Sequence, residues 1–500
     1  MKYISTRGHE APITSAAAII RGLALDRGLY VPETIPALPL SLRGANATKQ
    51  SGTPTPYAAV AHSTLAAFFT DFADDELNAC VTAAYDEKFD APDITPIVKT
   101  ENAYFLELWH GSTAAFKDMA LSILPWLLKT AARKEGEDKK IAILTATSGD
   151  TGKAALAGFA DVPGTEIIVF YPKDGVSVVQ ERQMLTQEGA NVHVYGIRGN
   201  FDEAQTGVKS VFADAALAEG LADRGVRLSS ANSINIGRLV PQVAYYINAY
   251  AKLVAQGEVA DGERINVCVP TGNFGNILAA WYAKQMGLPI AKLICASNEN
   301  KILTDFINTG VYDTRRDFIL TSSPSMDILV SSNLERLLFH LSGGDAERIR
   351  ALMGGLEENG VYDVGAEAKS SFSSDFYGGY AEMAMSHVSL ARLWREESYL
   401  MDTHTAVAYA VYMDYRARTG DTAKTLIAST ASPYKFAGSV AGALGIEAGA
   451  DEFATLGNLE KSTGIAVPRS LRGLEGKPVL HDAVIEKTAV KAAVTDALFA

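Results

Sequence analysis

Ile141-Ala-Ile-Leu-Thr-Ala-Thr-Ser-Gly-Asp-Thr-Gly152 joins an apolar run to a glycine-rich turn, and a helix is predicted directly after it over residues 152–159. A short apolar run that ends in turn residues predicts a buried strand over residues 141–146. Hydroxyl and backbone N–H groups converge in the turn, and the start of a helix suits an anion such as a carboxylate or phosphate. The stretch is therefore a β-α unit and a candidate anion site.

The same alternation continues on both sides of this stretch. Further strands are predicted over residues 103–108, 166–171, 191–195, 225–228, 265–269, 290–296 and 425–429. Helices are predicted over residues 117–134, 177–188, 201–220, 238–256, 277–286, 333–341, 345–357, 381–396 and 404–417, and residues 371–380 are ambiguous. This order predicts an α/β protein with parallel sheets flanked by helices, whose ligands bind outside the carboxyl ends of the strands.

The first 95 residues differ from this pattern. A helix is predicted over residues 14–26, capped by Thr14 or Ser15 and with apolar positions that include Leu23 and Leu25. A polar loop is predicted over residues 41–56, and helices over residues 57–90. We therefore expect a helical N-terminal region over residues 1–95. A large α/β domain would comprise residues 96–135 and 235–500, and a small mobile α/β domain residues 136–234.

Composition limits the classes of function. The chain has 500 residues, of which 48% are apolar and 21% charged, as in ordinary globular proteins. Its net charge of −13 disfavours a nucleic-acid partner. There is no basic start followed by an apolar run and no stretch long enough to span a membrane. Cys80, Cys268 and Cys295 form no CxxC pair, so we expect buried thiols, no metal site and a cytoplasmic protein.

A lysine lies at the end of Glu107-Leu-Trp-His-Gly-Ser-Thr-Ala-Ala-Phe-Lys-Asp118, just before an apolar helix. The positive end of a helix dipole and burial both favour the neutral amine, which is the form that makes a Schiff base with an aldehyde cofactor. Lysines at helix starts are usually exposed. The aromatic neighbours Trp109, His110 and Phe116 favour a functional Lys117 instead.

Two further polar turns precede predicted helices. In Pro270-Thr-Gly-Asn-Phe-Gly-Asn276, Gly272 and Gly275 can adopt positive φ and let the backbone approach a phosphate closely. Ser230-Ala-Asn-Ser-Ile-Asn-Ile-Gly-Arg238 places an arginine where it could bind a phosphate or carboxylate. Ordinary helix caps remain an alternative for each turn taken alone, with Ser148 or Asp150 as the cap of the 145–152 turn. A nucleotide P-loop around Lys153 is disfavoured because its pattern fails at two positions.

These stretches, taken in order, resemble the bacterial and fungal threonine synthases, a family of fold-type II pyridoxal phosphate enzymes related to tryptophan synthase β. The similarity runs along the whole chain. The motifs that carry it are residues 3–8, 28–32, 109–118, 148–152, 232–238, 271–276 and 429–433. The resemblance implies a fold-type II enzyme that converts O-phospho-L-homoserine and water to L-threonine and phosphate, acting as a monomer or homodimer.

The resemblance also implies roles for individual residues. Lys117 would bind pyridoxal 5'-phosphate covalently and act as the catalytic base. Asp150 would lie near the ring hydroxyl and Thr430 near the ring nitrogen. The cofactor phosphate would bind Gly272, Asn273, Phe274, Gly275 and Asn276. The substrate carboxylate would bind Thr147, Ser148 and Thr151, and the substrate phosphate Asn232, Ser233 and Arg238.

The chain departs from the family pattern at Ser112, where relatives usually have Pro, and at Ser432, where they often have His. His404 fits the family, and we interpret it mainly as a packed residue at a helix start. Three rivals remain open at this stage: a phospholyase that releases 2-oxobutyrate, ammonia and phosphate, a serine or threonine dehydratase, and a non-catalytic phosphoamino-acid sensor.

Overall fold

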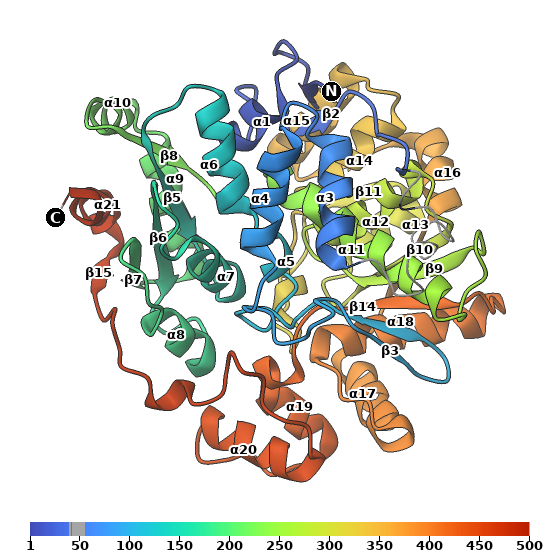
Figure 1. The fold of residues 1–500 in the computed structure, drawn as a ribbon. Coiled ribbons are helices and arrows are strands. Elements are labelled where there is room, and N and C mark those ends of the chain that lie inside the picture. The colour runs from blue at the N-terminus through green and yellow to red at the C-terminus, as the bar shows by residue number, and fades with distance from the viewer. Residues whose placement is uncertain (40–41, 43–55, 500) are drawn as a thin grey trace.

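The computed structural model describes residues 1–39, 42 and 56–499. Its two larger sheets lie side by side, with the N-terminal helices in front of them (Figure 1). The predicted loop over residues 41–56 falls almost entirely outside the described residues. The predicted α/β class with parallel sheets is confirmed.

The larger sheet has six strands, and all but its edge strand β3 run parallel. In spatial order they are β13 (Phe376–Tyr380), β10 (Ile290–Ser297), β9 (Ile265–Pro270), β14 (Thr425–Ser429), β4 (Tyr104–Glu107) and β3 (Ile97–Lys99). The central strands β9 and β14 are buried along their whole length, which explains their continuous apolar sequences. The ambiguous segment 371–380 is the end of α16 (Gly365–Asp375) followed by β13.

The smaller sheet is parallel throughout. Its strands, in spatial order, are β15 (Val484–Glu486), β7 (Val192–Arg198), β6 (Thr165–Pro172), β5 (Lys140–Ala146) and β8 (Val226–Ser229). Residues 484–486 fall within the range assigned to the large domain, and no strand was predicted there. The chain instead returns across the molecule after α20 (Glu452–Thr463) and adds β15 to the edge of β7 (Figure 1). Short strands carry little sequence signal, so this return could not be seen in advance.

In its described residues, the N-terminal region contains three α-helices and a small antiparallel sheet. Its elements are β1 (Tyr3–Ser5), α1 (Ser15–Arg21), β2 (Tyr30–Pro32), α3 (Tyr57–Phe68) and α4 (Asp74–Ala84). Thr14 caps α1, as predicted, but the helix ends at Gly22. The expected apolar positions Leu23 and Leu25 therefore lie past its end and are exposed.

The other helices lie around the two sheets, and several of them pack directly on the strands. They are α5 (Asp118–Leu121), α6 (Leu124–Lys134), α7 (Asp150–Phe159), α8 (Val178–Leu185), α9 (Phe201–Phe212), α10 (Ala215–Asp223), α11 (Ile236–Ala255), α12 (Gly275–Met286), α13 (Ile302–Thr309), α14 (Leu334–Leu341), α15 (Ala346–Asn359), α17 (Met383–Glu397), α18 (Thr403–Thr419), α19 (Ala437–Leu444) and α21 (Val490–Phe499). The predicted helix 117–134 divides into α5 and α6, with Pro125 in the first turn of α6. The predicted helix 201–220 divides into α9 and α10.

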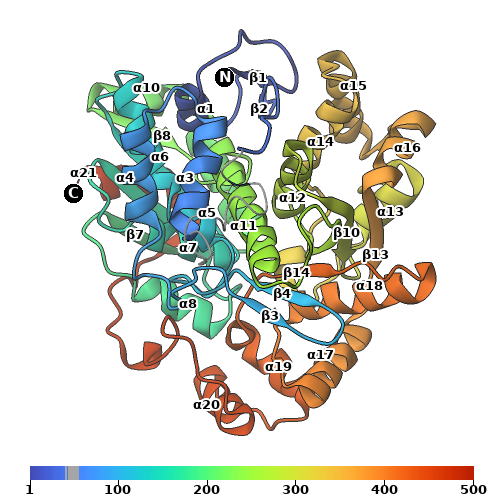
Figure 2. The same cartoon turned by 45° about the vertical axis from the view of Figure 1, so that its right-hand side comes forward.

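Helix α11 joins the parts of the molecule. All but its last residues are buried, and it packs against α3, α5 and α12 (Figure 2). One apolar core extends from Tyr3 through α11 to Ile167 of the small sheet. A separate core fills the outer face of the small sheet and includes Val494 of α21. No helix of the described residues is long and apolar enough to cross a membrane.

Candidate active site

The site lies at the carboxyl ends of strands from both sheets. In the large sheet, β14 lies between β4 and β9. The segment ending in Lys117 follows β4, Thr430 follows β14, and the turn 271–276 follows β9. Asp150 begins α7 after β5 of the small sheet. Predicted residues more than 300 positions apart are therefore brought together at one edge, where ligands of such folds bind.

Lys117 directs its amine at a carboxylate. Its side chain is 13% exposed, and Nζ donates to Asp150 Oδ2 at 3.3 Å and to Ser325 Oγ at 3.4 Å. Burial lowers the pKa of the Lys117 amine, and Lys435 and Arg238 lower it further against the opposing effect of Asp150. Helix α5 has only one turn, so burial has a larger part in this shift than the helix dipole.

Asp150 is the most heavily bonded side chain of the site. Its Oδ1 accepts from Gln180 Nε2 at 2.8 Å and from Lys435 Nζ at 2.9 Å, and its Oδ2 accepts from Ser325 Oγ at 3.2 Å as well as from Lys117. Burial alone would raise its pKa, but Lys435 and Lys117 hold the pKa of Asp150 well below its usual range. The carboxylate is therefore ionised.

Sequence reasoning missed Lys435 and Ser325. Lys435 follows the 429–433 motif by two residues and is completely buried in a 3₁₀ turn, η3 (Pro433–Phe436). Ser325 lies in a second 3₁₀ turn, η2 (Pro324–Met326), within a segment that had no predicted element. For Lys435, the one signal in the sequence was a lysine among largely apolar residues. For Ser325, no local sequence pattern indicated a role in the site.

His404 holds the η2 turn in place. Its Nδ1 is 2.7 Å from Asp402 Oδ2, and its Nε2 accepts the backbone N–H of Ser325 at 3.1 Å. Both His404 and Asp402 are buried. The interpretation of His404 as a packed helix-start residue is consistent with this position, and the structure adds a function in orienting Ser325.

The turn 271–276 is built for close approach of the backbone. A Cβ at Gly272 would lie 2.7 Å from the carbonyl oxygen of Ser325, so only glycine fits there. The expected positive φ is absent from Gly272 and Gly275 and falls on Phe274 instead, at 63°. Phe274 tolerates this backbone because its ring is buried beside Phe376. Gly275 then begins α12, whose free N–H groups face the turn.

Two buried polar groups of the site lack partners. Asn276 Oδ1 accepts from Tyr245 and Tyr246, but its Nδ2 has no hydrogen-bond partner among the described residues. Arg238 is 4% exposed and donates one bond, at 2.7 Å to the Ala231 carbonyl, while its Nε has no partner among the described residues. Burial lowers the pKa of Arg238 to about 10, so it stays charged. Unpaired buried donors beside a helix N-terminus and a low-pKa lysine fit a phosphate-bearing aldehyde cofactor and an anionic substrate.

The remaining predicted residues of the 145–152 turn differ in their burial and contacts. The N-cap position of α7 is Gly149, so neither Ser148 nor Asp150 caps the helix. Thr147 Oγ1 accepts the backbone N–H groups of Gly149 at 3.0 Å and of Gly152, in the first turn of α7, at 2.9 Å. Ser148 is exposed and Thr151 half-buried.

Polar residues also border the start of α11 and the end of β14. Asn232 is exposed, and its Oδ1 accepts from Ser233 Oγ at 3.3 Å. In the turn after β9, the carbonyl of Asn273 accepts a hydrogen bond from Asn333 Nδ2 at 3.0 Å. Thr430 is buried, and its carbonyl accepts the N–H of Phe116 at 2.8 Å.

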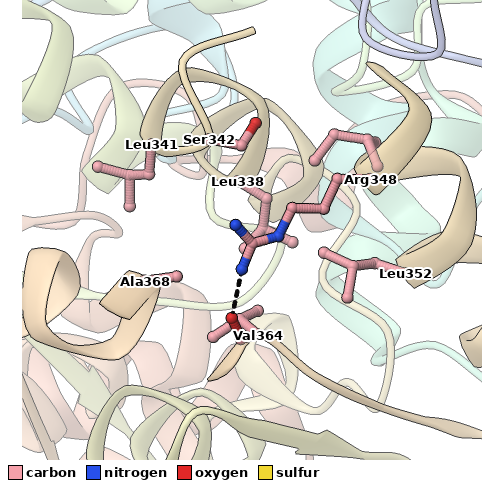
Figure 3. A pocket seen from close by; sticks show the side chains of 8 residues that line it. Leu338, Leu341, Ser342, Arg348, Leu352, Val364 and Ala368 are labelled. Carbon is pink, nitrogen blue, oxygen red and sulfur yellow. Dashed lines mark hydrogen bonds between the residues drawn. The ribbon is translucent and has the colours of Figure 1, made fainter. Parts of the chain in front are cut away.

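A hollow elsewhere does not compete with this centre. It lies between α14, α15 and α16 and is lined by Leu338, Leu341, Ser342, Arg348, Ile349, Leu352, Val364 and Ala368 (Figure 3). Arg348 spans it and donates to the Val364 carbonyl. Its lining is mostly aliphatic and contains no second titratable side chain, so the hollow is a packing feature.

Family models match almost the whole chain. The one described as threonine synthase N terminus matches residues 2–85, the one described as pyridoxal-phosphate dependent enzyme matches residues 88–362, and the one described as threonine synthase, C-terminal matches residues 405–494. Threonine synthase of Pseudomonas aeruginosa is 36% identical over 439 residues, which cover 87% of this chain and 89% of that protein. The chain belongs to the threonine synthase family.

Solved structures agree with this assignment. The structure of pyridoxal phosphate-bound threonine synthase from Brucella melitensis has a TM-score of 0.87 at 34% identity and covers all of both chains. That of threonine synthase from yeast has a TM-score of 0.88 at 32% identity, covering 99% of this chain and 98% of that one. The chain therefore has the fold-type II architecture and belongs to a pyridoxal phosphate-dependent family.

The human protein threonine synthase-like 1 is also similar, at 37% identity over 486 residues. The match covers 94% of this chain, but the chain spans only 62% of the length of that relative.

Proposed function

We propose that this protein is a threonine synthase that converts O-phospho-L-homoserine and water to L-threonine and phosphate in threonine biosynthesis. The observation that carries the proposal is the presence of two separate cationic groups: a lysine whose pKa is lowered, and a buried arginine that could bind an anion. Lys117 would bind the cofactor aldehyde, and the 272–276 turn its phosphate. Arg238, whose Nε lacks a partner among the described residues, would bind the substrate phosphate.

The chain's own residues divide the work. When bound, pyridoxal phosphate supplies an electron sink for negative charge at the substrate Cα. Lys117 removes the Cα proton and later returns a proton to the substrate, because a neutral amine on a flexible stem serves as base and, once protonated, as acid. Ser325 orients that amine through its Oγ. Thr147, Ser148 and Thr151 border the place of the substrate carboxylate, and Asn232 and Ser233 assist Arg238.

Asp150 and Thr430 would hold the cofactor ring. Asp150 lies beside Lys117 and is ionised, so it would accept a hydrogen bond from the ring hydroxyl. Thr430 would offer a neutral hydroxyl to the ring nitrogen, which therefore needs no proton. Phosphate leaves from the substrate Cγ and water adds at Cβ, so the site must hold both anions of the substrate while these bonds change.

A phospholyase that acts on the same substrate is the alternative to be distinguished. The two reactions differ in their products. Incubation with O-phospho-L-homoserine, followed by mass spectrometry, should yield threonine and phosphate. Formation of 2-oxobutyrate and ammonia in place of threonine would assign the protein to the phospholyases and refute the proposal.

Replacement of Lys117 tests the base itself. Borohydride reduction of the natural protein should attach the cofactor to the peptide that contains residue 117. Lys117→Ala should remove this attachment, the absorbance above 400 nm and the turnover. Turnover at the natural rate in this variant would exclude Lys117 as the base.

We further propose that the small α/β domain, residues 136–234 with the returning segment 484–499, closes over bound substrate and excludes water. Limited proteolysis with and without a phosphonate analogue tests this closure, and identical cleavage patterns would contradict it. We also propose that the protein acts in the cytoplasm, because its three cysteines are free and buried, as is usual in a reducing compartment. We propose that it is a monomer or homodimer.

A further inference from the structure

The completely buried Lys435 faces the same carboxylate as the cofactor-binding lysine, although no motif had indicated it. The segment that carries it runs antiparallel along the loop before Lys117. Phe116 N donates to the Thr430 carbonyl at 2.8 Å, and Ser432 N donates to the Ala114 carbonyl at 3.0 Å. Lys435 Nζ continues this series with a bond of 2.7 Å to the Thr113 carbonyl. Backbone pairing therefore fixes the position of the amine.

The two lysines hold opposite oxygens of Asp150. Lys435 Nζ is 2.9 Å from Oδ1, and Lys117 Nζ is 3.3 Å from Oδ2. The Lys435 side chain has no exposed surface, whereas the Lys117 side chain is 13% exposed. The shorter contact is thus the one made by the lysine whose side chain is the more deeply buried.

We propose that Lys435 is the permanent counter-ion of Asp150 and thereby frees Lys117 to act as a neutral amine. With only one lysine present, the buried carboxylate would hold a proton on that lysine, because burial makes an unpaired charge costly. With Lys435 in place, Asp150 keeps a positive partner when Lys117 loses its proton. This proposal rests on the proposed function only for the identity of Lys117 as the cofactor-binding residue.

A simple structural tie is the competing explanation, since Lys435 also links the two segments through the Thr113 carbonyl. The two explanations differ in what they predict for the amine of residue 117. A tie affects stability alone, whereas a counter-ion sets the pKa of its neighbour. The charged groups that face Lys117 are Asp150 from α7, Lys435 from η3 and Arg238 from α11.

The test measures the titration of Lys117 in the full-length protein freed of its cofactor. A small acylating reagent is applied over a range of pH, and mass spectrometry gives the rate at the peptide containing residue 117. Lys435→Met should raise the apparent pKa of Lys117 by about one unit, because it removes a cation and leaves Asp150 to Lys117 alone. Asp150→Asn should lower it, because two buried lysines then face each other.

The double variant decides the assignment. Asp150→Asn combined with Lys435→Met removes both charges and should bring the pKa of Lys117 back close to its natural value. Lys252→Met is the matched control, since Lys252 is also buried but is paired with Asp93 and the Thr95 carbonyl, remote from Asp150. It should leave the titration unchanged.

An unchanged pKa in Lys435→Met, or a raised pKa that persists in the double variant, would overturn the proposal. Should Lys435→Met fail to fold, Asp150→Asn and the double variant still give the decisive comparison: a pKa that does not fall in the first and recover in the second is an overturning result.

The acylation assay needs neither cofactor nor substrate, so its outcome is separate from that of the product assay. Threonine formation with an unaltered Lys117 titration would refute the counter-ion alone. The expected order of pKa values without threonine formation would refute the proposed reaction alone.

Discussion

At the scale of single residues, the site is a set of charges that are balanced by burial and contact. Asp150 and Lys117 were expected near each other, but Lys435 and Ser325 decide how they interact. Ser325 is connected to His404 and Asp402, which are buried behind it. Orientation of the Lys117 amine therefore depends in part on groups that do not contact it directly.

Ser325→Ala tests this orientation. The variant removes one hydrogen bond each from Lys117 and Asp150, and a bond of this kind is worth about 1 kcal/mol. We expect kcat for threonine formation to fall about three- to tenfold, with the pH profile of kcat displaced because the amine loses a partner. Ser322→Ala on the same loop, whose Oγ contacts His387, serves as the control. Equal kcat values and pH profiles for the two variants would contradict a function of Ser325.

His110 gives a pH-dependent contribution to stability. Burial lowers its pKa, but hydrogen bonds to Asp90 and Glu107 raise the pKa of His110 to about 9 overall. A raised pKa stabilises the folded state fully below the unfolded value of about 6.5, and this contribution is lost as the pH rises toward 9.

Melting temperatures measured between pH 6 and pH 9.5 check this prediction. The difference between the natural protein and His110→Gln should be largest near pH 6 and should shrink toward pH 9.5. The exposed His9→Gln should behave as the natural protein. A difference that grows with pH would show that the sign is wrong.

At the scale of elements, the two glycines of the turn after β9 differ in the space around them. Gly272 lies against the η2 turn, so an added Cβ would meet the Ser325 carbonyl at 2.7 Å. At Gly275 the nearest atom to an added Cβ is Asn333 Nδ2 at 3.4 Å, an ordinary contact. An added methyl group would therefore clash at Gly272 and would be tolerated at Gly275.

Gly272→Ala should lower the affinity for pyridoxal phosphate more than tenfold, because the turn must move away from Ser325. A tenfold loss corresponds to about 1.4 kcal/mol of binding free energy. Gly275→Ala should have a smaller effect. Gly220→Ala on α10, where an added Cβ meets nothing within 4 Å, should leave affinity unchanged. Cofactor content after dialysis against a series of concentrations measures all three. Equal losses for Gly272→Ala and Gly220→Ala would contradict the steric argument.

The N-terminal motif also acts at this scale. Thr6 and Arg7 bind Glu335, and the neighbouring Arg336 donates to the Tyr30 carbonyl at 2.9 Å. Arg336 also contacts Asn333, which in turn donates to the Asn273 carbonyl. The first elements of the chain thus support the turn 271–276 through α14, although they are remote from it in sequence.

At the scale of the whole molecule, the returning C-terminal segment completes the small sheet. Strand β15 pairs with β7, and Val490 and Val494 of α21 fill the core on the outer face of that sheet. Three surface ion pairs of this segment, Lys487 with Glu203, Lys491 with Asp214 and Glu486 with Arg198, are partly or largely exposed and contribute little.

Val494→Asp should release this segment, because a buried carboxylate without a partner is costly. We expect amide hydrogen exchange to accelerate in β7 and α9, while the large sheet keeps its protection. Lys491→Ala, which removes only an exposed ion pair, should leave exchange unchanged. Uniform acceleration over both sheets would contradict the assignment of the segment to the small domain.

The sequence by itself determined the β-α alternation, the anion turns and the candidate Lys117, because hydrophobic periodicity and turn chemistry are local properties. It also carried the motifs that identify the family. The tertiary structure alone decided that β15 joins the small sheet, that Phe274 rather than a glycine takes the left-handed backbone, and that Lys435 and Ser325 reach Asp150. These features depend on which distant segments meet, and no local pattern of residues specifies that.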